Sequence, residues 1–533
     1  MSGTSKKQNF LQGAALLALA TAIVKVIGAL YKLPLNAIIG EKGFGYFYTA
    51  YDIYNVLLLI STAGLPVAVS KMISEANALG HYNQVRRVYN TSRIIFLSLG
   101  LISSLLMVVF CKQLAVFQEQ PDAWFAILCL GPCAFLVCLL STYRGFFQGQ
   151  SNMLPTSISQ VLEATVKLIV GIAAAIVLLK MTQSVSMAAG GAILGVTVSC
   201  LVSAFYLRSR FMKDYRTLPK TGEAVTSYGL TAKKMLGIAI PITIGTAGLQ
   251  LLTVLEAKIY MAQLLGSGMS QSDADTVKGI YNMCQTIYKM PCAFITPITI
   301  SVIPAITSQL TLGNLKAAKA TEESAARVSA LISMPCAFGL AILAQPVTQL
   351  LGGYSGEKLA LATQLMSVLG ICIIFNSTVL LTNAIMQAHG HEKLPVVNMF
   401  VGGFVKLIAV FILTGNPAIG IVGTPIGSLL CYLCITVLNL FTMRRVLQDP
   451  PAIVKHMLRA FLAAALMGAC ALGAWKGLQM LLGSDVSALI ACAVPIAIGV
   501  VVYAIAAVKF RAITREDCLL LPKGEKIANL LHL

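Results

Sequence analysis

Residues 148–170 read QGQSNMLPTSISQVLEATVKLIV, and residues 387–409 read QAHGHEKLPVVNMFVGGFVKLIA. Both begin with a glutamine and carry a Val-Lys-Leu-Ile run near their end, and Gln148 and Gln387, like Lys167 and Lys406, lie 239 residues apart. A Leu-Pro pair keeps this spacing to within one residue. Chance likeness between two apolar segments is the alternative. Because the polar landmarks share one spacing, we instead predict two copies of one structural unit.

The composition is that of a membrane protein. Of 533 residues, 57% are hydrophobic and only 11% are charged, and the mean hydropathy is +0.82. About fourteen stretches are as long and apolar as a membrane-crossing helix requires, the first two at residues 11–33 and 45–68. They lack the two-residue alternation of a barrel strand. We predict an all-α polytopic membrane protein with about 14 transmembrane helices.

The repeat then divides the chain into parts. We predict an N-terminal lobe of six helices (1–207), a basic cytoplasmic linker (208–235), a C-terminal lobe of six helices (236–443), and two last helices with a cytoplasmic tail (444–533). Both lobes start on the same side of the membrane, so the repeat is parallel. Transporters built from repeats hold their substrate between them.

The net charge of +19 indicates orientation rather than nucleic-acid binding. With the N-terminus inside, most lysines and arginines fall in inner loops, as the positive-inside rule requires. The outer side then carries only Lys42, Lys112, Lys180, Lys278, Lys358 and Lys476. We predict a multi-pass protein of the bacterial cytoplasmic membrane, with both termini cytoplasmic and with contacts to anionic membrane lipids.

Lysines occur inside the apolar stretches. Lys25, Lys167 and Lys406 each lie within one, where an ammonium costs at least about 2.5–3.5 kcal/mol unless it faces a wet cavity or a partner. Lys32 follows Lys25 by two helical turns on the same face, although it could instead reach the outer surface. These residues predict a cationic cavity and an anionic cargo.

Acidic and polar residues accompany the lysines. Asp52 and Asn55 lie in the second stretch among tyrosines, which predict an interfacial belt or, alternatively, a stacking platform, and Asp52 is a candidate partner for Lys25 or Lys32.

Glu163 precedes Lys167 by four residues, the favourable order for an intrahelical ion pair. Lys406 has Gly402 at the corresponding position and would need an acid from another helix or an anion. Glu256 is a candidate ion or proton site.

We predict no catalysis. No Gly-Lys dipeptide occurs in the chain, which excludes a P-loop, and no cofactor is expected. The closest approaches to a metal motif are Cys431 and Cys434 within one stretch, and His389 and His391 in a short loop. Neither has the further ligands of a zinc site, so we predict no metal.

Three segments resemble one family: VKVIGALYKLPL (24–35), ISTAGLPVAVSKMISE (60–75) and YRGFFQGQSNMLPTSISQVLE (143–163). They resemble the polysaccharide-biosynthesis branch of the multidrug/oligosaccharidyl-lipid/polysaccharide exporter superfamily, which contains stage V sporulation protein B and the MurJ-type lipid II flippases. The resemblance implies a cation-lined cavity, in which Lys25 and Lys32 match essential basic residues, and a lipid-tail groove formed with the last two helices. It also implies an ion site at Glu256, Asn398 and Thr424. Gly402 departs from the family by replacing an acid, which speaks against sodium coupling.

The residues and the resemblance together predict a flippase. Its cargo would be an undecaprenyl-pyrophosphate-linked cell-wall precursor, lipid II in the first instance, moved by alternating access in a monomer. Na⁺, H⁺ or the membrane potential would drive it. Two alternatives stay open: a cation-coupled multidrug exporter, and a non-transporting membrane scaffold of the envelope or of sporulation.

Overall fold

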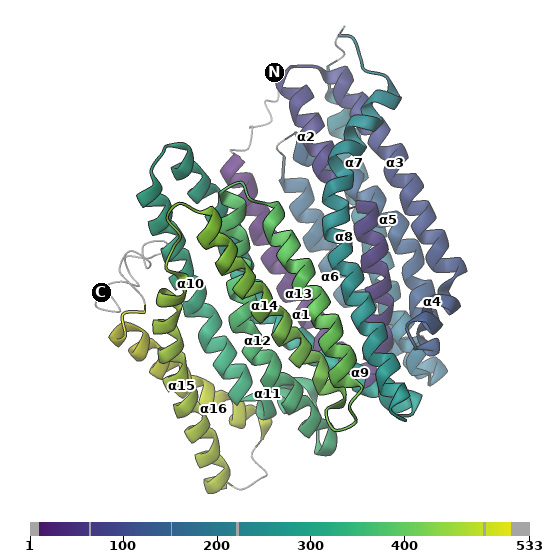
Figure 1. The fold of residues 1–533 in the computed structure, drawn as a ribbon. Helices are drawn as coiled ribbons and strands as arrows, with labels where there is room; N and C mark the ends of the chain where they lie inside the picture. The colour runs from purple at the N-terminus through teal and green to yellow at the C-terminus, as the bar shows by residue number, and fades with distance from the viewer. Residues whose placement is uncertain (1–9, 63–64, 151, 220–222, 483–486, 513–533) are drawn as a thin grey trace. The chain divides into compact units, whose positions relative to one another are not determined.

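The computed structural model describes residues 10–62, 65–150, 152–219, 223–482 and 487–512, and they contain helices and no strand (Figure 1). The predicted all-α class is confirmed. The elements are α1 Phe10–Thr62, α2 Leu65–Ala78, α3 Tyr82–Val109, α4 Cys111–Phe117, η1 Pro121–Ala123, α5 Trp124–Gly149, α6 Leu154–Thr182, α7 Val185–Thr217, α8 Tyr228–Gly266, α9 Gln271–Thr311, α10 Leu315–Ile342, α11 Ala344–Gly352, α12 Gly356–Ala388, α13 Lys393–Thr414, η2 Gly420–Val422, α14 Gly423–Val446, α15 Ile453–Leu482 and α16 Ala488–Lys509.

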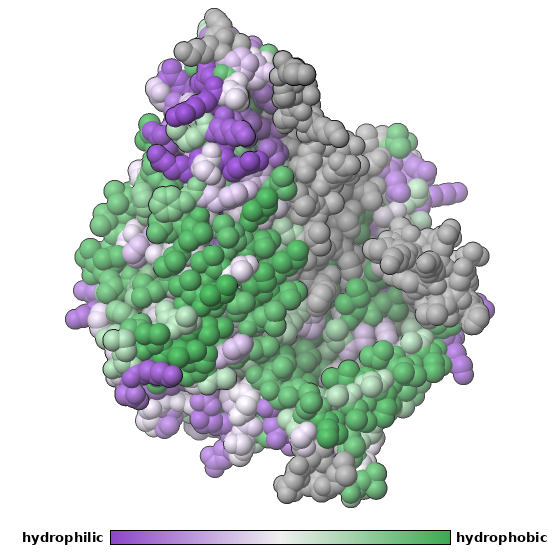
Figure 2. Space-filling model, turned by 180° about the vertical axis from the view of Figure 1, so that it is seen from behind, coloured by the Kyte–Doolittle hydropathy of each residue, from purple (hydrophilic) through white to green (hydrophobic). Residues whose placement is uncertain are grey.

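Many of these helices fit a bilayer. Within the described residues, ten helical segments are long and apolar enough to cross a membrane. Figure 2 shows apolar side chains over the middle of one face and hydrophilic side chains at its upper and lower ends, the distribution expected for a protein embedded in lipid. The chain is a multi-pass membrane protein, and the count of about fourteen spans stays a prediction.

The first predicted stretch (11–33) and most of the second (45–68) lie in one element. α1 runs through 53 residues, which as a straight helix would be about 80 Å long, far more than a bilayer requires. Gly40 interrupts it with a φ of 67° and a ψ of 179°, a conformation that favours glycine. Within α1, the two stretches are separated by this break at Gly40 rather than by a loop.

The helix order repeats with the spacing found in the sequence. α5 and α12 end at Gly149 and Ala388, and α6 and α13 begin at Leu154 and Lys393, so both pairs of boundaries are 239 residues apart. α7 and α14 begin at Val185 and Gly423, which are 238 residues apart, so the repeat extends over three consecutive helices, α5–α7 and α12–α14.

The chain divides into two compact units. Unit 1 contains residues 1–265 and 269–279, and unit 2 contains residues 266–268 and 280–533. The division lies near the start of α9 and not in the basic segment 208–235, because α8 and the first turns of α9 group with the N-terminal helices. The predicted domain boundaries stay a prediction.

In unit 1, small residues bring α6 directly against α7. A Cβ on Gly195 would lie 2.3 Å from the Cα of Gly171, and one on Gly191 would lie 2.8 Å from the carbonyl oxygen of Ala174. Only glycine permits such a close approach. This contact fixes α6, the helix that carries Glu163 and Lys167.

Candidate functional site

Two of the predicted lysines lie close together in unit 1, where α1 packs along α6. The Lys32 Nζ donates a hydrogen bond to the Tyr48 hydroxyl at 2.8 Å. The Lys167 Nζ lies 5.7 Å from the centre of the Tyr31 ring, and the charges of Lys32 and Lys167 are near enough to repel each other. Lys25 belongs to α1, but its side chain is outside the described residues. Lys32 and Lys167 together form a local concentration of positive charge.

The aromatic residues around these lysines are mostly buried. The rings of Tyr31, Phe47 and Tyr48 contact one another, and none of these side chains is more than 9% exposed. The prediction of an interfacial belt was therefore wrong, since a belt would face the lipid headgroups. The rings instead form one wall beside the lysines.

Glu163 has a different partner from the one predicted. Its carboxylate forms an ion pair with Arg144 of α5 at 2.9 Å, and the Arg144 Nε donates to the Ser159 hydroxyl at 3.1 Å. The intrahelical pair with Lys167 is not the one that forms, because Arg144 reaches the carboxylate from the neighbouring helix. Lys167 remains within the electrostatic influence of Glu163. Sequence patterns do not identify Arg144 as a site residue, because its ion pair with Glu163 joins two different helices.

A second polar cluster in unit 1 takes up Asp52. The fully buried Lys278 of α9 donates to Thr49 of α1 at 2.6 Å, and it also interacts with the charges of Asp52 and Asp275. Asp52 therefore acts on a lysine that was not predicted, because the start of α9 packs where α1 carries Thr49 and Asp52. Its pairing with Lys25 or Lys32 stays a prediction. Asn55 lies half-buried one turn further along α1.

Asp275 anchors the same cluster. It accepts hydrogen bonds from Gln120 at 2.8 Å, from Gln271 at 3.0 Å and from the Tyr46 hydroxyl at 3.1 Å. The spacing of Asp275 and Lys278, on one face of a helix start, was the available sequence signal for this cluster.

Two residues of the predicted ion site, Asn398 and Thr424, lie far apart within unit 2. Glu256 is buried in unit 1, where its charge and that of Asp52 act on Tyr260. In unit 2, Asn398 lies near the start of α13 and bonds to Asn439 of α14 at 2.9 Å, whereas Thr424 lies at the other end of α14. Thr424 and Asn439 are fifteen residues apart, roughly 22 Å along a helix. One ion could not contact both Asn398 and Thr424.

Asn398 instead belongs to an amide cluster that joins three helices. Asn439 also donates to Thr382 and to Asn383 of α12, both at 2.8 Å, and Asn398 donates to Thr442 at 3.3 Å. Buried amides that satisfy one another hold helices together. The role of Asn398 in this arrangement is structural.

The last predicted lysine, Lys406, lies on α13 and faces the two neighbouring helices. Its charge acts on Tyr432 of α14 and on Cys372 of α12. Tyr288 bonds to Asn376 of α12 at 2.9 Å and to Tyr432. Like Lys167, Lys406 is therefore close to a tyrosine.

Unit 2 also contains an apolar groove of about 590 Å³ between α10, α15 and α16. Its walls include Leu331, Pro335, Met467, Gly499 and Tyr503. The Tyr503 hydroxyl of α16 donates a hydrogen bond to the carbonyl oxygen of Leu331 of α10 at 3.0 Å. A groove of this composition suits a hydrocarbon chain.

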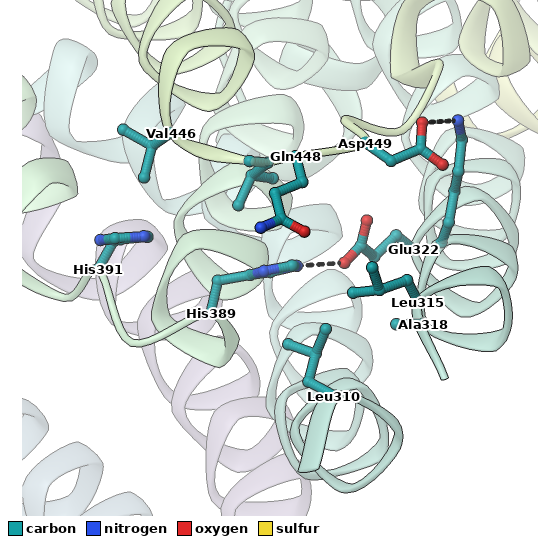
Figure 3. A pocket seen from close by; sticks show the side chains of 11 residues that line it. Leu310, Leu315, Ala318, Glu322, His389, His391, Val446, Gln448 and Asp449 are labelled. Atoms are coloured by element: carbon teal, nitrogen blue, oxygen red, sulfur yellow. Dashed lines mark hydrogen bonds and ion pairs between the residues drawn. The ribbon is translucent and has the colours of Figure 1, made fainter. Parts of the chain in front are cut away.

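A smaller pocket of about 210 Å³ lies where the α12–α13 turn meets the start of α10 (Figure 3). His389 points at the buried Glu322 across 2.7 Å, while His391 lies apart from this pair, and Lys319 bonds to Asp449 at the rim. Among the described residues, no three His, Cys, Asp or Glu side chains are grouped as metal ligands would be.

Known proteins are similar to this chain in sequence and in fold. The lipid II flippase MurJ of Bacillus subtilis is 24% identical over 75% of this chain and 76% of its own length, and stage V sporulation protein B of the same organism is 24% identical over 83% and 85%. A structure of MurJ in an inward closed conformation superposes with a TM-score of 0.68 at 14% identity, covering 93% of this chain and 99% of that one. An inward-facing multidrug resistance MATE transporter of the MOP superfamily gives 0.61 at 14% identity, over 82% and 95%.

These likenesses agree with the resemblance seen in the sequence. The fold is that of MOP-superfamily transporters, shared by flippases and drug exporters alike. The family model that describes polysaccharide biosynthesis proteins matches residues 10–310, more than half of the chain. The chain belongs to the polysaccharide biosynthesis protein family.

Proposed function

We propose that this membrane transporter is a flippase for an undecaprenyl-pyrophosphate-linked cell-wall precursor, lipid II in the first instance. The observation that carries the proposal is the pair Lys32 and Lys167, two half-buried ammonium groups held near each other on α1 and α6. Lys167 is subject to the attraction of Glu163 as well as to the repulsion of Lys32, and the burial of its ammonium group costs free energy. A pyrophosphate between them would relieve that repulsion.

The chemistry of the two side chains suits this ligand. A lysine ammonium offers three donors on a flexible stem, and it binds phosphate oxygens as a point charge. The Lys167 ammonium group contacts the ring of Tyr31, and the Lys32 ammonium group donates to the hydroxyl of Tyr48. Lys406 beside Tyr432 offers the same combination in unit 2, and Lys25 adds a fourth positive charge on α1.

The apolar groove supports the lipid half of the proposal. An isoprenoid tail needs an apolar path, and the groove along α15 and α16 supplies one through Met467, Pro495 and Gly499. A purely water-soluble anion would make no use of it. The relatives named above include a lipid II flippase, and the cargo of this chain is proposed by analogy with it.

The remaining features of the transport cycle belong to the same proposal. We expect a monomer that works by alternating access, with both termini cytoplasmic, anionic lipids at its basic surface, and either an ion gradient or the membrane potential as the driving force. No catalytic step is needed, because moving the cargo breaks no covalent bond.

Two rival functions make different demands. A cation-coupled multidrug exporter needs acids that are available to the drug. The candidates are Asp52 and Glu256, whose charges both act on Tyr260 in unit 1. Asp52, however, also acts on the buried Lys278. A membrane scaffold needs neither the lysines nor the acids.

Complementation tests the proposal. A strain depleted of its lipid II flippase should grow with the wild-type chain and with Lys180→Ala, an exposed lysine at the end of α6. It should fail with Lys32→Ala combined with Lys167→Ala, provided that the variant reaches the membrane in normal amount. Growth with that double variant would refute the proposal. Efflux of organic cations that needs Glu256 would favour the exporter instead.

A further inference from the structure

An ion pair joins α5 to α6 close to Lys167 in the sequence of α6. Glu163 lies one helical turn before Lys167 on α6, and Arg144 reaches across from α5 to hold the carboxylate at 2.9 Å. The exposed fractions of the Arg144 and Glu163 side chains are only 15% and 28%. Arg144 is itself held, since its Nε donates to Ser159, whose hydroxyl donates to the carbonyl oxygen of Thr156.

The second repeat keeps the lysine and loses the other two charges. At the same spacing of 239 residues, Arg144 corresponds to Asn383, Glu163 to Gly402 and Lys167 to Lys406. The structure supports this correspondence. Ser203 bonds to the carbonyl oxygen of Ser159 between α6 and α7, and the corresponding residues Thr442 and Asn398 bond between α13 and α14.

The arginine and the glutamate are thus present together in one repeat and absent together from the other. A glutamate four residues before a lysine normally pairs with it on a helix. In the first repeat, Glu163 pairs with Arg144 instead. In the second repeat, where Asn383 replaces the arginine, Gly402 replaces the glutamate, so the position of Glu163 carries no acid.

We propose that Arg144 is a positioning residue for cargo binding: it holds Glu163 and thereby keeps the Lys167 ammonium available to the anionic group of the cargo. This inference rests on the proposed function, since it assumes that Lys167 meets a pyrophosphate. It adds a residue that does not itself touch the cargo.

The electrostatics give the direction of each effect. Without Arg144, the half-buried Glu163 carboxylate is left without its partner, and Lys167 is the cation one turn away on the same face. Their pairing would cancel one of the two charges that Lys32 and Lys167 present. Without Glu163, both lysines keep their charge and Arg144 adds a third.

The experiment compares four forms of the full chain in lipid nanodiscs: wild type, Arg144→Gln, Glu163→Gln and the double variant. Undecaprenyl pyrophosphate is the probe, and uncharged undecaprenol is the matched ligand. Arg144→Gln should weaken binding of the pyrophosphate by about tenfold or more. Glu163→Gln should bind at least as tightly as wild type, and the double variant should return to within about twofold of it. Undecaprenol should bind all four forms equally.

Two further variants act as controls. Lys234→Gln breaks the exposed Lys234–Glu75 ion pair of the same unit, 3.0 Å long, and should leave binding unchanged. Arg144→Lys keeps a cation near Glu163 and should restore most of the affinity. Thermal unfolding of every variant separates loss of binding from loss of the fold.

The alternatives give other patterns. If the Arg144–Glu163 pair only stabilises the fold, Arg144→Gln and Glu163→Gln should weaken binding alike. If Arg144 contacts the cargo directly, the double variant should stay as weak as Arg144→Gln. Either result would overturn the inference while leaving the flippase proposal intact. Wild-type protein that fails to prefer the pyrophosphate over undecaprenol would overturn both.

Discussion

Replacing Lys167 by methionine tests the site most directly, because the two side chains are similar in length and differ in charge. Lys167 stands near Lys32, and its ammonium lies 5.7 Å from the Tyr31 ring centre. If it binds a pyrophosphate oxygen, its loss removes one charged hydrogen bond, about 1.5–3 kcal/mol. The full Coulomb energy of two charges 4 Å apart at an effective dielectric constant of 20 is about 4 kcal/mol, which gives an upper limit. Lys32 retains part of that attraction.

The expected loss of affinity is therefore roughly 10- to 150-fold. The stability of the protein should respond differently. Methionine removes the cost of an ammonium at bilayer depth and a repulsion with Lys32. It also removes the attraction to Glu163 and a cation–π contact worth about 0.5–1 kcal/mol, and the burial cost is the largest of these effects on Lys167. The free energy of unfolding should thus stay level or rise. Residues kept for binding rather than for stability typically show this opposition.

The assay measures the dissociation constant of undecaprenyl pyrophosphate in nanodiscs, and thermal unfolding of the same samples. Lys180→Met, a change of the same kind at the exposed end of α6, provides the control and should affect neither value. Affinity within twofold of wild type would refute the assignment of Lys167 to the cargo. Equal losses of affinity and stability would show instead that Lys167 holds the fold.

Three other predictions concern the fold and its orientation. Asn439→Ala leaves the amide cluster of α12, α13 and α14 unsatisfied and should lower the free energy of unfolding by about 1–3 kcal/mol in a denaturation experiment, and an unchanged value would contradict the structural role of that cluster. Gly195→Ala drives a methyl group into the backbone of α6 and should cost about 1–3 kcal/mol or prevent expression, whereas a stable variant would show that the two helices can separate freely. In a chain without native cysteines, a cysteine at the exposed Ser355 should react with an impermeant reagent from outside, and one at the exposed Thr217 only after permeabilisation. The reverse pattern would invert the predicted topology.

Patterns that can be read along the chain predicted the helices and their repeat. The shared spacing of Lys167 and Lys406 anticipated the matching starts of α6 and α13, because a repeated unit keeps its helix boundaries. Long apolar stretches anticipated the helices, since lipid leaves the backbone no other partner.

Such patterns could not predict which side chains pair between different helices. Arg144 and Glu163 are nineteen residues apart on different helices, and Asp52 and Lys278 are separated by most of unit 1. The i,i+4 rule proposed Lys167 as the partner of Glu163 because it considers one helix alone. Asn398 and Thr424 resembled an ion site in sequence, but the length of α14 separates them.

The Lys32–Tyr48 hydrogen bond spans the break at Gly40. Lys32 belongs to the half of α1 before the break, and Tyr48 to the half after it. The bond therefore links the two halves of α1 across the break. A ligand that binds the Lys32 ammonium in place of Tyr48 would break this hydrogen bond. We therefore expect the bend of α1 to depend on which group Lys32 binds.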